Sequence, residues 1–221
     1  MSLFLPRYLF PGVTLFDGRQ RGEPMFGLTV KQPFGSAIVN GPKRIENRPW
    51  RPWPRLCNGA FWIVVHAGAG LYDGAERRDF AEPRLNPWTN AMEGAMWRDC
   101  PELDTLPRRV VLGAARVIGC ARIERAEEAN RLLGPWAFGA ECWLLDPTVI
   151  RLPKPVPMEL GALSLWPLIP EKGARPERTA PEVWTRRIDQ GRAAVAALRE
   201  ARNDPAQWRW QPAAHAKEVR R

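Results

Sequence analysis

A short charged run between two apolar segments constrains the fold of this chain most strongly. Lys43, Glu46 and Arg48 lie close together in the segment 41–50. In an extended strand, side chains two residues apart share a face, so Glu46 and Arg48 are expected to point the same way, with Lys43 in the turn before them. Such a group indicates either a polar site on a hydrophobic frame or an edge strand whose solvated charges oppose aggregation.

The flanking segments predict how this strand is framed. Residues 27–32 predict a short strand ended by Pro33, and a helix is expected over 34–40, where Gly41 follows. Residues 61–68 form an almost continuous apolar run, whose length and β-branched content favour a buried strand. The expected order is therefore strand, helix, charged strand, loop and buried strand.

Three segments in this order, LTVKQPF at 28–34, GPKRIENR at 41–48 and WIVVHA at 62–67, resemble the ASCH domain. This family is a branch of the PUA-like superfamily, related in shape to the YTH and EVE readers of modified bases. Three later stretches resemble the closing strands of the family: 134–143, 152–157 and 161–166. The resemblance covers roughly residues 26–169.

The resemblance implies an α+β fold, a PUA-like mixed β-barrel of about five to six strands with flanking helices. A C-terminal helix is expected in addition. We divide the chain into an N-terminal extension (1–24), an ASCH/PUA-like domain (25–170) with an insertion (69–109), and a basic C-terminal helix and tail (171–221). Within these parts we expect a short helix over 90–98, a long strand over 110–123 and a helix over 124–133.

The C-terminal helix begins at a capping box with proline near its start, Thr179–Glu182, and is expected to run to about Arg202. Its apolar stripe holds Trp184, Ile188, Val195 and Leu198, while the arginines at 186, 187, 192 and 199 fall largely elsewhere. Either the stripe docks on the domain, or the helix lies along a nucleic-acid backbone. The tail from residue 207 onward is expected to be mobile.

The composition points to an anionic partner. The net charge is +9 and the apolar content is 45%, so the chain can support a core and attract nucleic acid. Arginine outnumbers lysine, which suits bidentate phosphate contacts, although a GC-rich genome gives the same bias.

Eleven tryptophans are many for this length. Trp62 and Trp166 are expected in the core. Trp50 and Trp53 lie in a proline-rich loop that alternates rings with arginines, as sites that stack single-stranded or flipped bases require. The alternative for both is a packing role.

The cysteines and histidines argue against a metal site. None of the four cysteines forms a C-x-x-C pair, and the chain has two histidines, so we expect no zinc and no cofactor. Cys120 and Cys142 are expected to be buried thiols. Neither a signal peptide nor a membrane span is predicted, which indicates a cytoplasmic protein.

His66 ends the buried strand and could donate to a phosphate or base edge, or satisfy a carbonyl group within the barrel.

The resemblance implies a nucleic-acid-binding cleft beside the charged run, with RNA favoured over DNA and a single strand or modified base as ligand. Lys43 and Arg48 would hold phosphate or carbonyl oxygens, and Glu46 would accept from a base amino group or orient Arg48. The candidate binding residues are Lys31, Gln32, Pro33, Lys43, Glu46, Arg48, Trp50, Trp53, His66 and Trp136.

Three alternatives to binding stay open. Some compact members of the family hydrolyse acetylated cytidine with a lysine, a threonine and a glutamate. Lys43 matches the lysine, but Glu46 stands at the threonine position and would hold Lys43 charged. The glutamate would have to be Glu124, Glu127 or Glu128. A ribonuclease would need an acid–base pair, such as Lys43 with Glu46 or His66, and a protein scaffold would use the insertion and tail.

Overall fold

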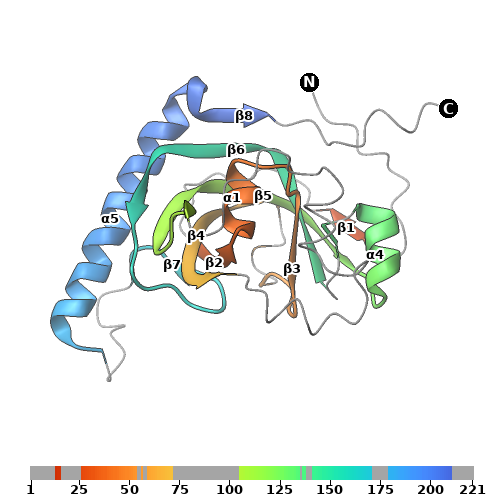
Figure 1. Ribbon diagram of the computed structural model, residues 1–221, viewed down its shortest axis with the longest axis horizontal. Helices are drawn as coiled ribbons and strands as arrows, with labels where there is room; N and C mark the ends of the chain where they lie inside the picture. Colours follow the sequence, from red (N-terminus) through yellow and green to blue (C-terminus); the bar gives the residue numbers. More distant parts are fainter. Residues whose placement is uncertain are drawn as a thin grey trace.

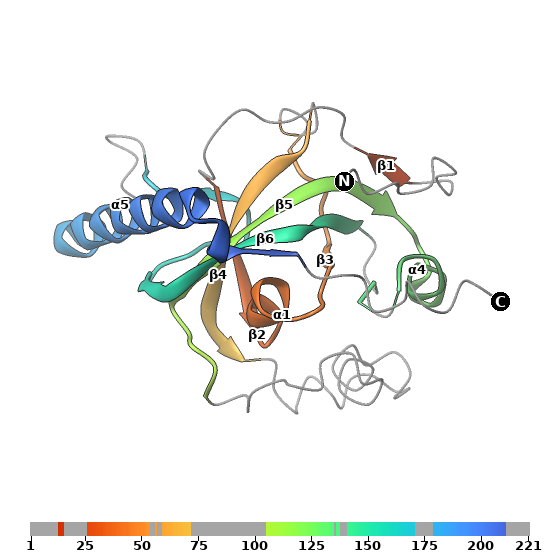
Figure 2. The same ribbon diagram turned by 90° about the horizontal axis from the view of Figure 1, so that it is seen from above.

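A single mixed sheet organises the part of the chain that the computed structural model describes, residues 13–15, 26–53, 56, 59–71, 105–134, 136–137, 141–170 and 179–210. Helices lie at both ends of this sheet, α4 at one and α5 at the other, while α1 lies between β2 and β3 (Figures 1 and 2). The fold is therefore α+β, as expected.

The described residues contribute eight strands to the sheet. They are β1 (Val13–Leu15), β2 (Phe26–Gln32), β3 (Ile45–Arg48), β4 (Phe61–Leu71), β5 (Val110–Arg122), β6 (Glu141–Pro157), β7 (Trp166–Pro167) and β8 (Trp208–Trp210). The main order is β3-β6-β5-β4-β2-β7, with β1 added to β5 and β8 added to β6. Only β2 and β4 run parallel among these pairs; the other neighbours are antiparallel.

The sheet is open. In the described part of the chain, no ladder joins the end strands β3 and β7, so the expected PUA-like barrel is not confirmed. The main path holds six strands, and β1 and β8 go beyond the expected five to six. Of the three stretches that resemble closing strands, β6 contains all of 152–157 and the last three residues of 134–143. The third stretch, 161–166, contributes only Trp166, to β7.

Three α-helices fall in the described residues: α1 (Phe34–Val39), α4 (Ala126–Leu133) and α5 (Pro181–Asn203). They confirm the helices expected after Pro33, after residue 123 and near the C-terminus. The start of α1 is fixed by Gln32, whose Oε1 accepts from the backbone N–H of Ser36 at 3.0 Å. The helix expected over 90–98 lies outside the described residues.

Both faces of the sheet are covered, which explains the continuous apolar run of β4. Along this strand Phe61 and Ile63 belong to the core on one face, where Trp143 also lies. Trp62 and Val64 belong to the core on the other face. A strand buried on both sides has apolar residues at every position rather than at alternate ones.

The helix α5 docks on the second of these cores. This confirms the expectation that an apolar stripe of the helix docks on the domain. Its buried residues are Arg187, Gly191, Ala194, Val195, Leu198 and Ala201. The buried stripe differs from the expected one, because Trp184 and Ile188 are only half-buried while Arg187 is enclosed.

The expectation of a mobile tail is wrong for its first part. Trp208–Trp210 forms β8, which pairs with Thr148–Ile150 of β6. Residues 211–221 lie outside the described part of the chain. The proposed division into extension, domain and C-terminal segment stays a prediction, and β1 and β8 both add strands to the central sheet.

Candidate functional site

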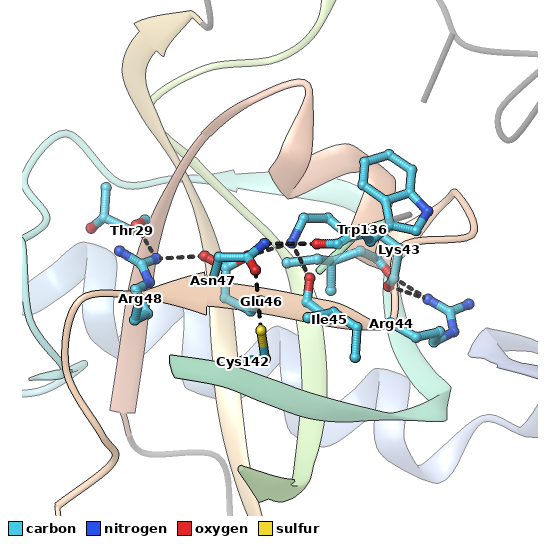
Figure 3. A network of polar contacts seen from close by, with 10 residues as sticks. Thr29, Lys43, Arg44, Ile45, Glu46, Asn47, Arg48, Trp136 and Cys142 are labelled. Carbon is cyan, nitrogen blue, oxygen red and sulfur yellow. Dashed lines mark hydrogen bonds and ion pairs between the residues drawn. The ribbon is translucent and has the colours of Figure 1, made fainter. Parts of the chain in front are cut away.

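The charged run forms a buried ion network. Glu46 and Arg48 share one face of β3, as the strand period predicted, and Arg48 Nη2 lies 3.0 Å from Glu46 Oε1. Lys43, just before the strand, places its Nζ 2.7 Å from Glu46 Oε2 (Figure 3). The Lys43 and Glu46 side chains are 1% and 6% exposed. The alternative expectation, an edge strand with solvated charges, is therefore wrong for this pair.

Lys43 is enclosed by backbone and aromatic rings. Its Nζ also donates to the carbonyl oxygen of Ile45, and it lies 5.8 Å from the ring centre of Phe34 and 6.0 Å from that of Trp136. Aromatic faces attract a cation at such distances. On the opposite face of β3, Asn47 Nδ2 donates to the carbonyl oxygen of Trp136 at 2.8 Å, which ties this tryptophan to the strand (Figure 3).

The network joins two basic groups to one acidic group. Burial lowers the pKa of the Lys43 amine, and the neighbouring Glu46 carboxylate offsets only part of this effect. Burial alone would raise the pKa of Glu46, but the positive charges of Lys43 and Arg48 outweigh it and lower that pKa. With Lys43 protonated, the network has two cations around one carboxylate, and an anion nearby would balance the excess.

Arg48 extends this network to another strand. Its Nη2 donates to the carbonyl oxygen of Thr29 on β2 at 2.8 Å. The Nε of Arg48 and the Nε1 of Trp136 are buried and have no hydrogen-bond partner within the described part of the chain. Buried donors of this kind are uncommon, and they are candidates for bonds to a ligand or a water molecule.

The hydrogen bonds of Thr29 also determine which ring nitrogen of His66 carries the proton. The Thr29 Oγ1 accepts from Trp166 Nε1 at 3.1 Å and from the backbone N–H of Ala162 at 3.2 Å. Because a hydroxyl has two lone pairs and one proton, that proton is left for His66 Nδ1, 3.1 Å away. His66 then carries its own proton on Nε2 and donates it to the carbonyl oxygen of Met158 at 2.9 Å.

His66 is thus placed as a buried neutral residue. It is 2% exposed, and burial lowers its pKa. Of the two expectations for His66, the structure gives the bond to a backbone carbonyl. Contact with a phosphate or base stays a prediction.

The candidates on and after β2 differ in exposure. Gln32 is fully buried, and its Nε2 donates to Ser36 Oγ at 2.9 Å and to the carbonyl oxygen of Pro107 at 2.7 Å. Pro33 is buried at the start of α1. Lys31 is exposed on β2. The structure places Gln32 and Pro33 in the frame and leaves Lys31 at the surface.

Trp50 and Trp53 both pack on the core beneath the loop. The Trp50 ring lies 4.9 Å from that of Trp143, edge to face, and its carbonyl oxygen accepts from Trp143 Nε1 at 3.2 Å. The Trp53 ring lies 5.6 Å from that of Phe26 on β2. Each ring is only half-buried, so the packing role is established while stacking on a base stays a prediction.

Sequence reasoning missed two contributors to this region, Thr29 and Arg187. A polar Thr29 inside an apolar strand was an available signal, because buried hydroxyls need partners.

Cys120 and Cys142 are buried, as expected. Among the described residues, no group of His, Cys, Asp and Glu is suited to hold a metal ion. No described helix is long and apolar enough to cross a membrane.

Comparison with known proteins shows to which family this region belongs. No curated protein matches the chain. The family model of the ASCH domain matches residues 28–153, which is more than half of the chain and includes the whole ion network. An ASCH domain suggests an RNA-binding or related function of the PUA-like kind. The chain belongs to the ASCH domain family.

Proposed function

We propose that this protein binds nucleic acid at the surface next to the Lys43–Glu46–Arg48 network, with single-stranded RNA or a modified base as the preferred ligand. The observation that carries the proposal is that two basic side chains, Lys43 and Arg48, share one buried carboxylate, so that the network has an excess of positive charge when Lys43 is protonated. Phosphate groups are the anions that such charge attracts most strongly in a nucleic acid. Membership of the ASCH family supports the same class of ligand.

The loop after β3 supplies further contacts in this proposal. Trp50 and Trp53 leave part of each ring exposed beside Arg51, whose side chain is 50% exposed. Half-exposed rings next to a guanidinium group suit stacking on unpaired bases with a phosphate contact alongside. Arg51 pairs with Glu141 at 3.1 Å. The exposed arginines of α5 are paired as well, Arg186 with Glu159 at 3.3 Å and Arg192 with Asp189 at 3.5 Å, so a phosphate group would compete with a carboxylate at each of these positions.

The geometry favours binding over hydrolysis. Glu46 occupies the position where a hydroxyl nucleophile would be needed, and its carboxylate lies 2.7 Å from the amine of Lys43. This contact favours the protonated amine, which cannot act as a base, while burial acts in the opposite direction and lowers the pKa of Lys43 overall. Glu124 and Glu128, two of the three carboxylates considered for the third role, are exposed rather than part of the buried network.

Fluorescence anisotropy with a labelled single-stranded RNA of about 12 nucleotides tests the proposal. We expect binding at low salt that weakens steeply between about 50 and about 200 mM salt, because phosphate contacts release counterions. A DNA of the same sequence should bind more weakly. Absence of binding to either nucleic acid at low salt would contradict the proposal.

A matched pair of variants locates the binding surface. Arg48→Met removes a cation from the network and should weaken RNA binding about 30-fold, the low end of what the loss of one partner of a buried charged contact costs. Arg192→Met makes the same chemical change on the exposed face of α5 and should leave the affinity nearly unchanged. Equal losses in both variants would place the binding surface elsewhere. Release of cytidine from acetylcytidine by the wild-type protein, abolished in Lys43→Ala, would favour the hydrolase instead.

A further inference from the structure

The C-terminal helix reaches the ion network through a continuous set of contacts, the last of which joins the Arg48 side chain to the backbone carbonyl oxygen of Thr29. The contacts begin at Arg187 on α5, pass through Trp166 on β7 and Thr29 on β2, and end at Arg48 on β3. Residues 154–210 lie beyond the segment that matches the ASCH family. Arg187 and Trp166 therefore lie outside the family match, whereas Thr29 and Arg48 lie inside it.

Arg187 is an unusual residue for a helix that docks on a core. It is 6% exposed, and no carboxylate lies within ion-pairing distance of it in the described part of the chain. Its Nη1 donates to the carbonyl oxygen of Leu168 at 2.6 Å and its Nη2 to that of Pro167 at 3.0 Å. Burial lowers the pKa of this guanidinium to about 10. Burying a cation without a counter-charge costs desolvation free energy, so the contacts of Arg187 must offset that cost.

The contact that stands out is with Trp166. The guanidinium carbon of Arg187 lies 4.4 Å from the centre of the Trp166 ring, a stacking distance at which the ring face attracts a cation. The two carbonyl groups that Arg187 binds belong to the residues just after Trp166. Arg187 therefore holds both the ring and the backbone of this short strand.

Trp166 in turn positions β2. The strand β7 pairs with β2 so that Trp166 faces Gly27, and a Cβ atom at Gly27 would lie only 2.4 Å from the tryptophan ring. Two residues further along β2, Thr29 Oγ1 accepts from Trp166 Nε1 at 3.1 Å. Close ring contact and a hydrogen bond together fix where this part of β2 lies.

The position of β2 then determines the position of Arg48. The Thr29 carbonyl oxygen accepts from Arg48 Nη2 at 2.8 Å, and the same nitrogen lies 3.0 Å from Glu46 Oε1. The guanidinium is thus held between one backbone carbonyl on β2 and one carboxylate on its own strand. A shift of β2 would move the first of these acceptors and reorient the guanidinium.

We propose that Arg187 is a positioning residue for the binding site: by stacking on Trp166 it fixes Thr29 and thereby sets the orientation of Arg48. The C-terminal helix is then part of the site, although it lies outside the family match. The RNA readout of this inference rests on the proposed function, whereas its structural readout does not.

The structural readout uses the Arg48 Nε–H group, which is buried. We expect it to give a slowly exchanging signal in a ¹⁵N–¹H NMR spectrum, and the loss of that signal in Arg48→Lys would assign it. We expect the signal to shift in Arg187→Met, which keeps an unbranched side chain but removes the stacked cation and both carbonyl contacts. Val195→Ala, a cavity in the same core on the same helix, should lower stability without shifting the signal.

The binding readout uses the same variants. Arg187→Met should weaken RNA binding about tenfold, within the range of coupling between distant sites, while Val195→Ala should change it little. Trp166→Phe keeps a ring beneath Arg187 but removes the donor to Thr29, and it should shift the Arg48 signal even if Arg187→Met fails to fold. An unchanged Arg48 signal in the folded variants would overturn the inference. If the wild-type protein binds no RNA, the proposed function fails, and the NMR comparison still decides the positioning role.

Discussion

Arg48 Nη2, on β3, lies 2.8 Å from the carbonyl oxygen of Thr29, on β2, although no backbone ladder joins these two strands. In the order of the sheet, β6, β5 and β4 stand between them. A second contact between the same regions is the edge-to-face pair of Trp53 and Phe26 at 5.6 Å. The sheet curves far enough to bring β3 and β2 together, and side chains rather than backbone bonds connect them.

The first prediction concerns the carboxylate at the centre of the network. Glu46→Gln removes the counter-charge of two buried cations, and we expect it to lower the free energy of unfolding by about 3 kcal/mol. Urea denaturation of the variant and the wild type measures the difference. Glu200→Gln, at an exposed position on α5, is the matched control and should change stability by less than about 0.5 kcal/mol. A loss as small as that of the control would mean that the network contributes little to folding.

The sequence allowed part of this network to be predicted. The two-residue period of a strand placed Glu46 and Arg48 on one face, and β3 confirms it. Burial of Lys43 could not be foreseen, because it depends on how the turn before β3 aims a long side chain at Glu46 and between two rings. The open sheet could not be foreseen either: the expected barrel needs a ladder between the end strands, and the pairing of strands far apart in the sequence is a property of the tertiary fold.

The C-terminal helix shows where pattern reasoning failed. The buried positions 187, 191, 194, 198 and 201 follow a regular helical spacing of four and three residues. The sequence pattern nevertheless places Arg187 outside the apolar stripe, and charged residues are rarely enclosed without a charged partner. The carbonyl groups of Pro167 and Leu168 make its burial possible, and their position is a property of the tertiary fold.

The second prediction is a dependence of stability on pH through His66. Burial lowers its pKa below the ordinary value of 6.5, so the folded protein keeps His66 neutral where the unfolded chain binds a proton. The unfolded state is then favoured as the pH falls below 6.5, and stability should decrease from pH 6.5 down to the lowered pKa. Arg187 on α5 reinforces this effect, because its positive charge opposes a second cation nearby.

Urea denaturation at several values between about pH 7.5 and about pH 5.5 measures this dependence. His66→Gln should remove the decrease, whereas His215→Gln, at the other histidine of the chain, should retain it. If His66→Gln shows the same decrease as the wild type, another group is responsible.

The third prediction is that Cys120 is chemically inert in the folded protein. Burial and then the Glu141 carboxylate, which accepts from its thiol at 3.3 Å, raise the pKa of Cys120 to about 12. The reactive thiolate is therefore scarce at neutral pH. Alkylation with iodoacetamide followed by peptide mass mapping should leave Cys120 unmodified in the native protein and modify it in urea. Rapid modification of the native protein would contradict the burial of this thiol.

The last prediction concerns the loop that covers Thr29 and His66. A Cβ atom on Gly161 would lie 2.2 Å from Thr29 Oγ1 and 2.6 Å from His66 Nδ1. Neither atom can easily move, because Thr29 also accepts from Trp166 and Ala162, and His66 donates to Met158.

Gly161→Ala should therefore displace the loop and lower the free energy of unfolding by about 1–3 kcal/mol, as overpacking does in other cores. Gly70→Ala is the matched control, since its Cβ atom would meet the Lys31 side chain at an ordinary 3.6 Å. Thermal denaturation of both variants compares them, and the Gly161 variant should melt at the lower temperature. Equal melting temperatures would show that the loop can shift away from Thr29 and His66 without cost, and that the hydrogen bonds between them add little to the stability of the fold.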